Sequence, residues 1–187
     1  IEPLSMGYAI AYIKEDELEA FGANEQVIYI EKPKNLLLSR QPSIAASCML
    51  SVKNPPLSLT GRGVFVAVID TGIDIFHPDF IDENGDTKIY ALWDQTVKGS
   101  PPKPFLNGNL YTKEEINKVL HSESERYDFR SRDRSGHGTH VASICAGING
   151  VAPEAELIVV KLGDTREQGF PRTTQLMTAL QYVINEA

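Results

Sequence analysis

The strongest constraint on the fold of this chain is residues 64–69, Val-Phe-Val-Ala-Val-Ile, which are apolar at every position. An unbroken apolar run of this length is typical of a parallel strand that is covered on both faces. Residues 157–162 form a second such run, and residues 138–148 between them have apolar side chains at helical spacing. Because parallel strands are joined through helices, this order predicts an α/β fold with a parallel sheet flanked by helices. The linking helix is expected to bury Val141, Ile144, Cys145 and Ile148.

Two more helices are predicted around this framework. One covers residues 174–187, with four apolar residues facing inward: Leu176, Leu180, Val183 and Ile184. The other lies in an insertion over residues 82–132, where Thr112 and Glu115 have the spacing of a capping box. This second helix is expected to bury Ile116, Val119 and Leu120.

The first 60 residues have a different organisation. Residues 1–40 are predicted to form a small α+β unit, with a strand over 8–13, a short acidic helix over 14–21 and a strand over 27–30. Such a unit is too small to bury a core of its own, so it should dock on another part of the protein or be the end of a larger unit. Residues 41–60 contain Pro42, Pro55 and Pro56 and are interpreted as an extended connector.

The negative net charge of the chain bears on which classes of macromolecule it could bind. The chain has 187 residues and a net charge of −7. Nucleic acids and anionic membrane surfaces attract basic patches, so this charge argues against both as partners. No apolar run approaches the roughly 18 residues of a transmembrane helix.

The candidate functional residues stand at two glycine-containing turns. Asp70 follows the first apolar strand, at the carboxyl edge of the sheet, where α/β proteins place catalytic groups. His137 lies between two glycines at the predicted start of the linking helix, where a substrate could reach its ring. A carboxylate that orients a histidine base is typical of Asp–His–Ser hydrolases. Taken singly, Asp70 could equally cap a turn, and His137 could be an ordinary residue of a glycine-rich turn.

Metal binding is the less favoured interpretation of two clusters. His137 and His140 do not have the spacing of a zinc pair, and no third ligand is evident. Asp82, Asn84 and Asp86 could hold a structural calcium ion, but the bidentate glutamate of an EF-hand loop is missing. A hairpin turn is therefore favoured at residues 82–86, and no cofactor is predicted beyond this possible calcium.

Residues 66–73 and 137–143, taken together and in this order, resemble the subtilisin-like serine protease family. Residues 77–80 and 150–161 resemble the same family, so the similarity covers about residues 60–187. The resemblance implies that Asp70 orients His137, and that His137 is the general base of an endopeptidase acting on protein substrates. The family's oxyanion-hole asparagine and nucleophilic serine match nothing in the sequence. Residues 61–187 are therefore expected to be the first half of a catalytic domain, inactive without its C-terminal part.

A closer resemblance is to the clostridial Csp-type germination subtilases, through residues 29–33, 92–96 and 111–117. In that group a prodomain assists folding and can remain bound after self-cleavage. The resemblance implies that residues 1–40 are the end of a prodomain, with a processing site in the connector near residues 39–47. It also implies a secreted or spore-associated setting.

Two alternatives of other classes remain. The Csp-type group includes pseudoproteases, so a catalytically inactive binding or regulatory scaffold is the main alternative. A metal-dependent hydrolase that uses His137, His140 and Asp70 is the other. In either case the unpaired apolar edge of a half-sheet is expected to make the isolated chain poorly soluble.

Overall fold

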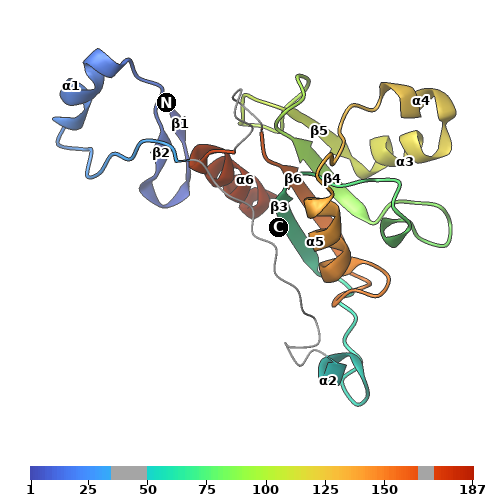
Figure 1. Cartoon of the computed structure of the whole chain (residues 1–187). Coiled ribbons are helices and arrows are strands. Elements are labelled where there is room, and N and C mark those ends of the chain that lie inside the picture. Colours follow the sequence, from blue (N-terminus) through green and yellow to red (C-terminus); the bar gives the residue numbers. More distant parts are fainter. Residues whose placement is uncertain (35–49, 164–170) are drawn as a thin grey trace.

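A four-stranded sheet forms the centre of the computed structural model, which describes residues 1–34, 50–163 and 171–187 (Figure 1). In order across the sheet the strands are β3 (Phe65–Asp70), β6 (Glu156–Lys161), β4 (Ile89–Asp94) and β5 (Asn109–Thr112). The first three are parallel, and β5 runs antiparallel to β4. The predicted α/β fold with a parallel sheet is thus confirmed.

Helices cover both faces of the sheet. These helices are α3 (Lys113–His121), α5 (His137–Ala146) and α6 (Thr173–Glu186). Helices α3 and α5 complete the core cluster on one face, and α6 completes the cluster on the other. The capping box is confirmed, because the Thr112 hydroxyl accepts from the Glu115 N–H and the Glu115 carboxylate accepts from the Thr112 N–H. The three residues predicted to face inward from α3 are buried: Ile116, Val119 and Leu120.

Strand β6 lies inside the sheet, whereas β3 lies at one edge of its described part. The four central residues of β6 are buried alternately on the two faces: Leu157 and Val159 on one, Ile158 and Val160 on the other. Strand β3 differs, because Phe65 and Ala67 are exposed. The prediction that residues 64–69 are covered on both faces is wrong for the described chain. Ile69 alone among these residues packs against the core cluster that α6 completes.

The buried stripes of α5 and α6 agree only in part with those predicted. Helix α5 buries Gly138, Ala142 and Ala146, and α6 buries Thr178, Ala179 and Tyr182. Ile148 lies beyond the end of α5 and is exposed, as are Leu180 and Ile184 of α6. The buried stripe of α5 consists of its smallest residues, which let the helix backbone approach the neighbouring chain closely. The apolar pattern was right for Val141, Cys145 and Val183, which are partly buried and pack against the core. It was wrong for Ile148, Leu180 and Ile184.

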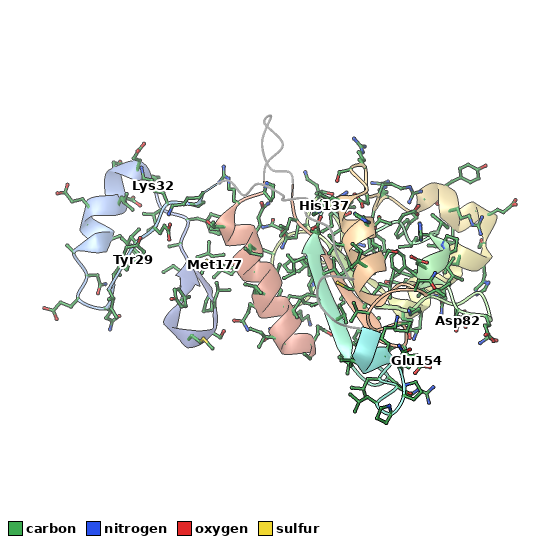
Figure 2. All side chains as sticks on the ribbon, turned by 60° about the horizontal axis from the view of Figure 1, so that its bottom comes forward. Tyr29, Lys32, Asp82, His137, Glu154 and Met177 are labelled. Carbon is green, nitrogen blue, oxygen red and sulfur yellow. The ribbon has the colours of Figure 1, made fainter. Side chains whose placement is uncertain are left out.

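Residues 1–34 form a small unit beside α6. Its elements are β1 (Glu2–Pro3), paired antiparallel with β2 (Ala9–Ile10), two 3-10 turns (Ser5–Gly7 and Glu15–Glu17) and α1 (Leu18–Gly22). The strand predicted over residues 27–30 is absent, and Ile28 in that segment is fully exposed. Figure 2 shows Tyr29 and Lys32 on the far side of α6 from His137.

Three hydrogen bonds join this unit to α6 within the described residues, as its small size led us to expect. The Ser5 N–H donates to Oε1 of Gln181 at 2.6 Å. The Thr173 N–H donates to the Lys34 carbonyl at 3.0 Å, and the Lys34 N–H donates to the Thr173 hydroxyl at 3.1 Å. The segment that follows residue 34 contains the predicted processing site at residues 39–47, which lies outside the described residues.

Shorter elements complete the described chain. They are α2 (Leu50–Lys53), within the predicted connector, a 3-10 turn at Pro78–Phe80 and α4 (Glu123–Asp128). None of the helices that the structure describes is long and apolar enough to cross a membrane.

Candidate active site

A row of charged residues ends the three parallel strands. Asp70 is in register with Lys161, and Lys161 is in register with Asp94. Because the three strands are parallel and in register, these side chains meet at one carboxyl edge of the sheet. The sequence placed Asp70 at this edge, and the structure adds the other two.

Asp70 and His137 are in direct contact. Nδ1 of His137 lies 2.7 Å from Oδ1 and 2.9 Å from Oδ2 of Asp70. Oδ1 also accepts the N–H of Thr71 at 2.7 Å. The two side chains are only 10 and 11% exposed, so this hydrogen bond is largely shielded from water. Because an ionised carboxylate can only accept, a neutral His137 carries its proton on Nδ1, and Nε2 is left as the basic nitrogen.

Glycines allow the two segments to meet. Gly136 caps α5 with φ 73°, a left-handed conformation that favours glycine. Gly138 packs on the backbone of Gly72, and a Cβ added at Gly138 would fall well inside contact distance of the Gly72 carbonyl oxygen. The two glycine-containing turns that the sequence singled out therefore touch through their backbones.

Asp133 is a residue of this site that the sequence interpretation missed. Its two carboxylate oxygens accept five hydrogen bonds, from the hydroxyls of Thr71 and Thr139 and from the N–H groups of Ser135, Gly136 and Thr139. Burial by itself would raise the pKa of Asp133, but the hydrogen bonds from Thr139, Thr71 and Gly136 together hold the pKa below its ordinary value. The only sequence signal was an acidic residue shortly before the helix start, a common feature of helix N-termini.

Lys161 supports the same edge of the sheet. Its Nζ donates to the carbonyl of Arg132 at 2.6 Å and lies 3.8 Å from Oδ2 of Asp94. Asp94 is completely buried, and its Oδ1 accepts both the N–H and the hydroxyl of Thr96. Lys161 thus brings a positive charge to a buried carboxylate and anchors the residue immediately before Asp133.

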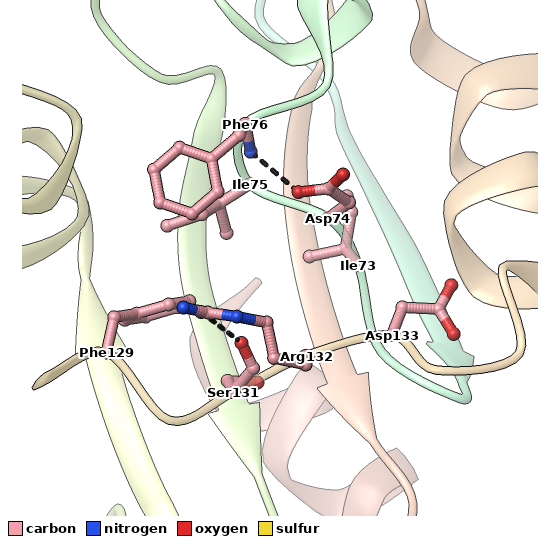
Figure 3. A pocket seen from close by; sticks show the side chains of 8 residues that line it. All are labelled: Ile73, Asp74, Ile75, Phe76, Phe129, Ser131, Arg132 and Asp133. Carbon is pink, nitrogen blue, oxygen red and sulfur yellow. Dashed lines mark hydrogen bonds between the residues drawn. The ribbon is translucent and has the colours of Figure 1, made fainter. Parts of the chain in front are cut away.

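A pocket of about 300 Å³ lies beside this network, between residues 73–76 and residues 129–133 (Figure 3). In it the guanidinium of Arg132 lies 5.1 Å from the ring centre of Phe129 and 5.7 Å from that of Phe76. A second pocket of about 320 Å³ is lined by Asp74, His140 and neighbours. Neither set of lining residues includes Asp70 or His137, but both include Asp133.

The residues considered as metal ligands either make hydrogen bonds within the protein or lie away from other candidate ligands. In the turn at residues 82–86, Oδ1 of Asp82 accepts the N–H groups of Asn84 and Asp86, and Asp86 pairs with His121. His140 is exposed. Within residues 1–34, 50–163 and 171–187, no group of three histidine, cysteine or acidic side chains is arranged to hold a metal ion.

Comparison with known proteins identifies the family. Residues 61–187 match the subtilase family, and residues 1–34 match the prodomain of Csp protease B. The chain belongs to the subtilase family. Its fold is similar to that of the CspB protease of Clostridium perfringens, with a TM-score of 0.64 and 36% identity over 75% of this chain and 29% of that one.

Curated relatives of this subtilase are serine proteases. The major intracellular serine protease of Bacillus subtilis (strain 168) is 28% identical over 92% of this chain and 43% of its own length. The intracellular serine protease of Paenibacillus polymyxa is 30% identical over 67% of this chain and 31% of its own length. The chain thus spans less than half the length of these relatives.

Proposed function

We propose that this subtilase chain supplies the acid and base members of a serine endopeptidase triad. The observation that carries the proposal is the contact of His137 Nδ1 with both carboxylate oxygens of Asp70 at the carboxyl edge of the parallel sheet. In this role Asp70 holds the imidazole in one orientation and stabilises it when it becomes positively charged. His137 takes a proton through Nε2 from the attacking hydroxyl and later gives it to the leaving amine.

The proposed nucleophile is a serine outside residues 1–187. Ser143 is the only serine after His137 in the sequence, and its hydroxyl hydrogen-bonds to the carboxylate of Asp79. The Ser143 hydroxyl is therefore bonded to Asp79, on a different side of α5 from His137. The substrate proposed for the whole protein is a polypeptide, and the 187 residues alone are expected to have no peptidase activity.

The proposed organisation assigns residues 1–40 to the end of a prodomain, 41–60 to a connector and 61–187 to the first part of a catalytic domain. The similarity of residues 1–34 to a Csp prodomain supports this, as do the hydrogen bonds that join Ser5 and Lys34 to α6. A prodomain that stays docked after cleavage would keep such contacts. Sequencing the N-termini of the purified protein tests it, because an uncleaved connector would contradict processing at residues 39–47.

The catalytic proposal is tested on protein expressed from its complete coding sequence. Hydrolysis of a peptide library and labelling by a serine-directed fluorophosphonate are measured for the wild type and for His137→Ala. Removing the base should lower kcat by about 10⁶-fold. His140→Ala is the matched control, because His140 lies three residues along the same helix with an exposed ring.

Each result has a clear meaning. Activity that is lost in His137→Ala and kept in His140→Ala supports the triad. Equal loss in both variants, together with inhibition by chelators, would favour a metal-dependent hydrolase. A folded wild type with neither hydrolysis nor labelling would contradict the proposal and favour the binding scaffold.

A further inference from the structure

We propose that Asp133 is a positioning residue for the Asp70–His137 pair, acting through the hydroxyls of Thr71 and Thr139. This inference rests on the proposed function and adds a further residue to it. Asp133 lies outside the pair itself, in the segment between α4 and α5.

Two threonines connect Asp133 to the two halves of the pair. Thr71 follows Asp70, and its hydroxyl donates to Oδ1 of Asp133 at 2.9 Å while accepting the N–H of Gly138 at 2.9 Å. Thr139 belongs to the helix of His137. Its hydroxyl donates to Oδ2 of Asp133 at 2.7 Å while accepting the N–H of Asp74 at 2.9 Å.

Each threonine also hydrogen-bonds to the opposite segment. The Thr71 hydroxyl, next to β3, accepts the N–H of Gly138 in α5. The Thr139 hydroxyl, in α5, accepts the N–H of Asp74 in the loop after β3. A displacement of either segment along or away from the other would stretch at least one of these hydrogen bonds. The distance between Asp70 and His137 is set by the same two segments.

A hydrogen-bond acceptor at residue 133 determines which way the hydroxyl protons of Thr71 and Thr139 point. A hydroxyl has one proton to donate, and Thr71 and Thr139 both direct it to Asp133. Their lone pairs are then turned toward the two backbone N–H groups. Each carboxylate oxygen of Asp133 accepts at least two hydrogen bonds. In Asp133→Asn an NH₂ group replaces one of these oxygens. It cannot accept those hydrogen bonds and would face other donors.

Hydrogen bonds also fix the backbone on both sides of Asp133. Its oxygens accept the N–H groups of Ser135, Gly136 and Thr139 at the start of α5, where helix N–H groups have no partner within the helix. On the other side, Lys161 donates to the carbonyl of Arg132. Asp133 is thus anchored to the central strand β6 through its neighbour, and can transmit that position to His137.

The test compares Asp133→Asn with Asp128→Asn in protein from the complete coding sequence. Both variants remove one negative charge in the same region, but Asp128 is exposed, and its side chain makes no hydrogen bond among the residues that the structure describes. Two quantities are measured: kcat and KM for a peptide substrate, and the low-field NMR signal of the His137 Nδ1 proton shared with Asp70.

We expect kcat of Asp133→Asn to fall by about 10- to 100-fold with KM within about twofold, as for small misplacements of catalytic groups. The Nδ1 proton signal should shift or broaden. Asp128→Asn should match the wild type in both measurements. Wild-type kcat and an unchanged Nδ1 signal in folded Asp133→Asn would overturn the proposal.

A second pair of variants decides the question if Asp133→Asn does not fold. Thr71→Val keeps the shape of the side chain and removes one of the two connections, whereas Thr71→Ser keeps the hydroxyl. Loss of kcat and of the Nδ1 signal in Thr71→Val, with recovery in Thr71→Ser, supports the proposal, and equal behaviour of the two variants contradicts it. If the wild type has no peptidase activity, the proposed function fails, and the NMR signal alone still supports or overturns the positioning role.

Discussion

At the scale of single residues, the contact between Asp70 and His137 leads to a sharp prediction. Asp70→Asn keeps the size of the side chain but offers His137 Nδ1 a donor or a neutral acceptor, which favours the wrong tautomer. In an intact triad this change lowers kcat by about 10⁴-fold with little effect on the fold. Peptide hydrolysis by the full-length protein measures it, with Asp128→Asn as the charge-matched control. A loss below about tenfold would mean that Asp70 does not orient the base.

The carboxylate of Asp133 should also affect stability in acid. Its pKa is lowered in the folded state, so the unfolded state binds more protons between that lowered pKa and the ordinary value of about 3.9. The stabilisation is therefore present above about pH 4 and is lost as the pH falls through the folded-state pKa. Urea midpoints of the wild type should fall more steeply below pH 4 than those of Asp133→Asn. Parallel curves would contradict the hydrogen-bonded state described above.

At the scale of elements, the approach of α5 to the turn after β3 depends on one glycine. In Gly138→Ala the new Cβ would collide with the carbonyl oxygen of Gly72, so the helix start and His137 must shift. We expect a lower melting temperature and a loss of kcat of about 100-fold. Gly22→Ala, at the end of α1, is the matched control, because its Cβ would meet only the side-chain tip of Ile30. Wild-type activity in Gly138→Ala would show that the contact tolerates displacement.

At the scale of the whole molecule, the described surface contains apolar side chains that globular proteins usually cover. Phe65 of β3 and Tyr90 of β4 are each 38% exposed, with ring centres 4.8 Å apart, and Leu180 and Ile184 of α6 are 47 and 59% exposed. Strand β3 also has a free edge within the described residues. Such surfaces promote association with other chains.

We therefore predict that the 187-residue chain associates with itself at micromolar concentration. The double variant Leu180→Gln and Ile184→Gln should reduce this association without lowering the free energy of unfolding, because both side chains are exposed. Sedimentation velocity at several concentrations measures it. Tyr127→Gln, which changes an exposed aromatic on α4, should have no effect. A monomeric wild type at every concentration would contradict the prediction.

Local patterns in the sequence were enough to predict the parallel sheet, the capping box of α3 and the two turns that carry Asp70 and His137. Each depends on residues close together in the chain: continuous apolar runs, a three-residue capping spacing and glycines beside a polar residue. The same reasoning was only partly right for the buried stripes of α5 and α6, and it failed for the coverage of β3. Those depend on which element lies opposite, and apolarity in one segment does not specify its neighbour.

The amino-acid sequence by itself therefore determined the class of fold, the succession of β3, α5, β6 and α6, and the two residues proposed for acid–base chemistry. It did not reveal that β4, which was assigned to an insertion over residues 82–132, is a parallel strand of the central sheet. Only the tertiary structure decided how those residues are held. Asp133 is 63 residues from Asp70 in the sequence, and the hydroxyl of Thr71 bonds to the N–H of Gly138, 67 residues away. Hydrogen bonds across such separations have no periodic signature in the chain, because they form only when packing on the sheet brings the segments within about 3 Å.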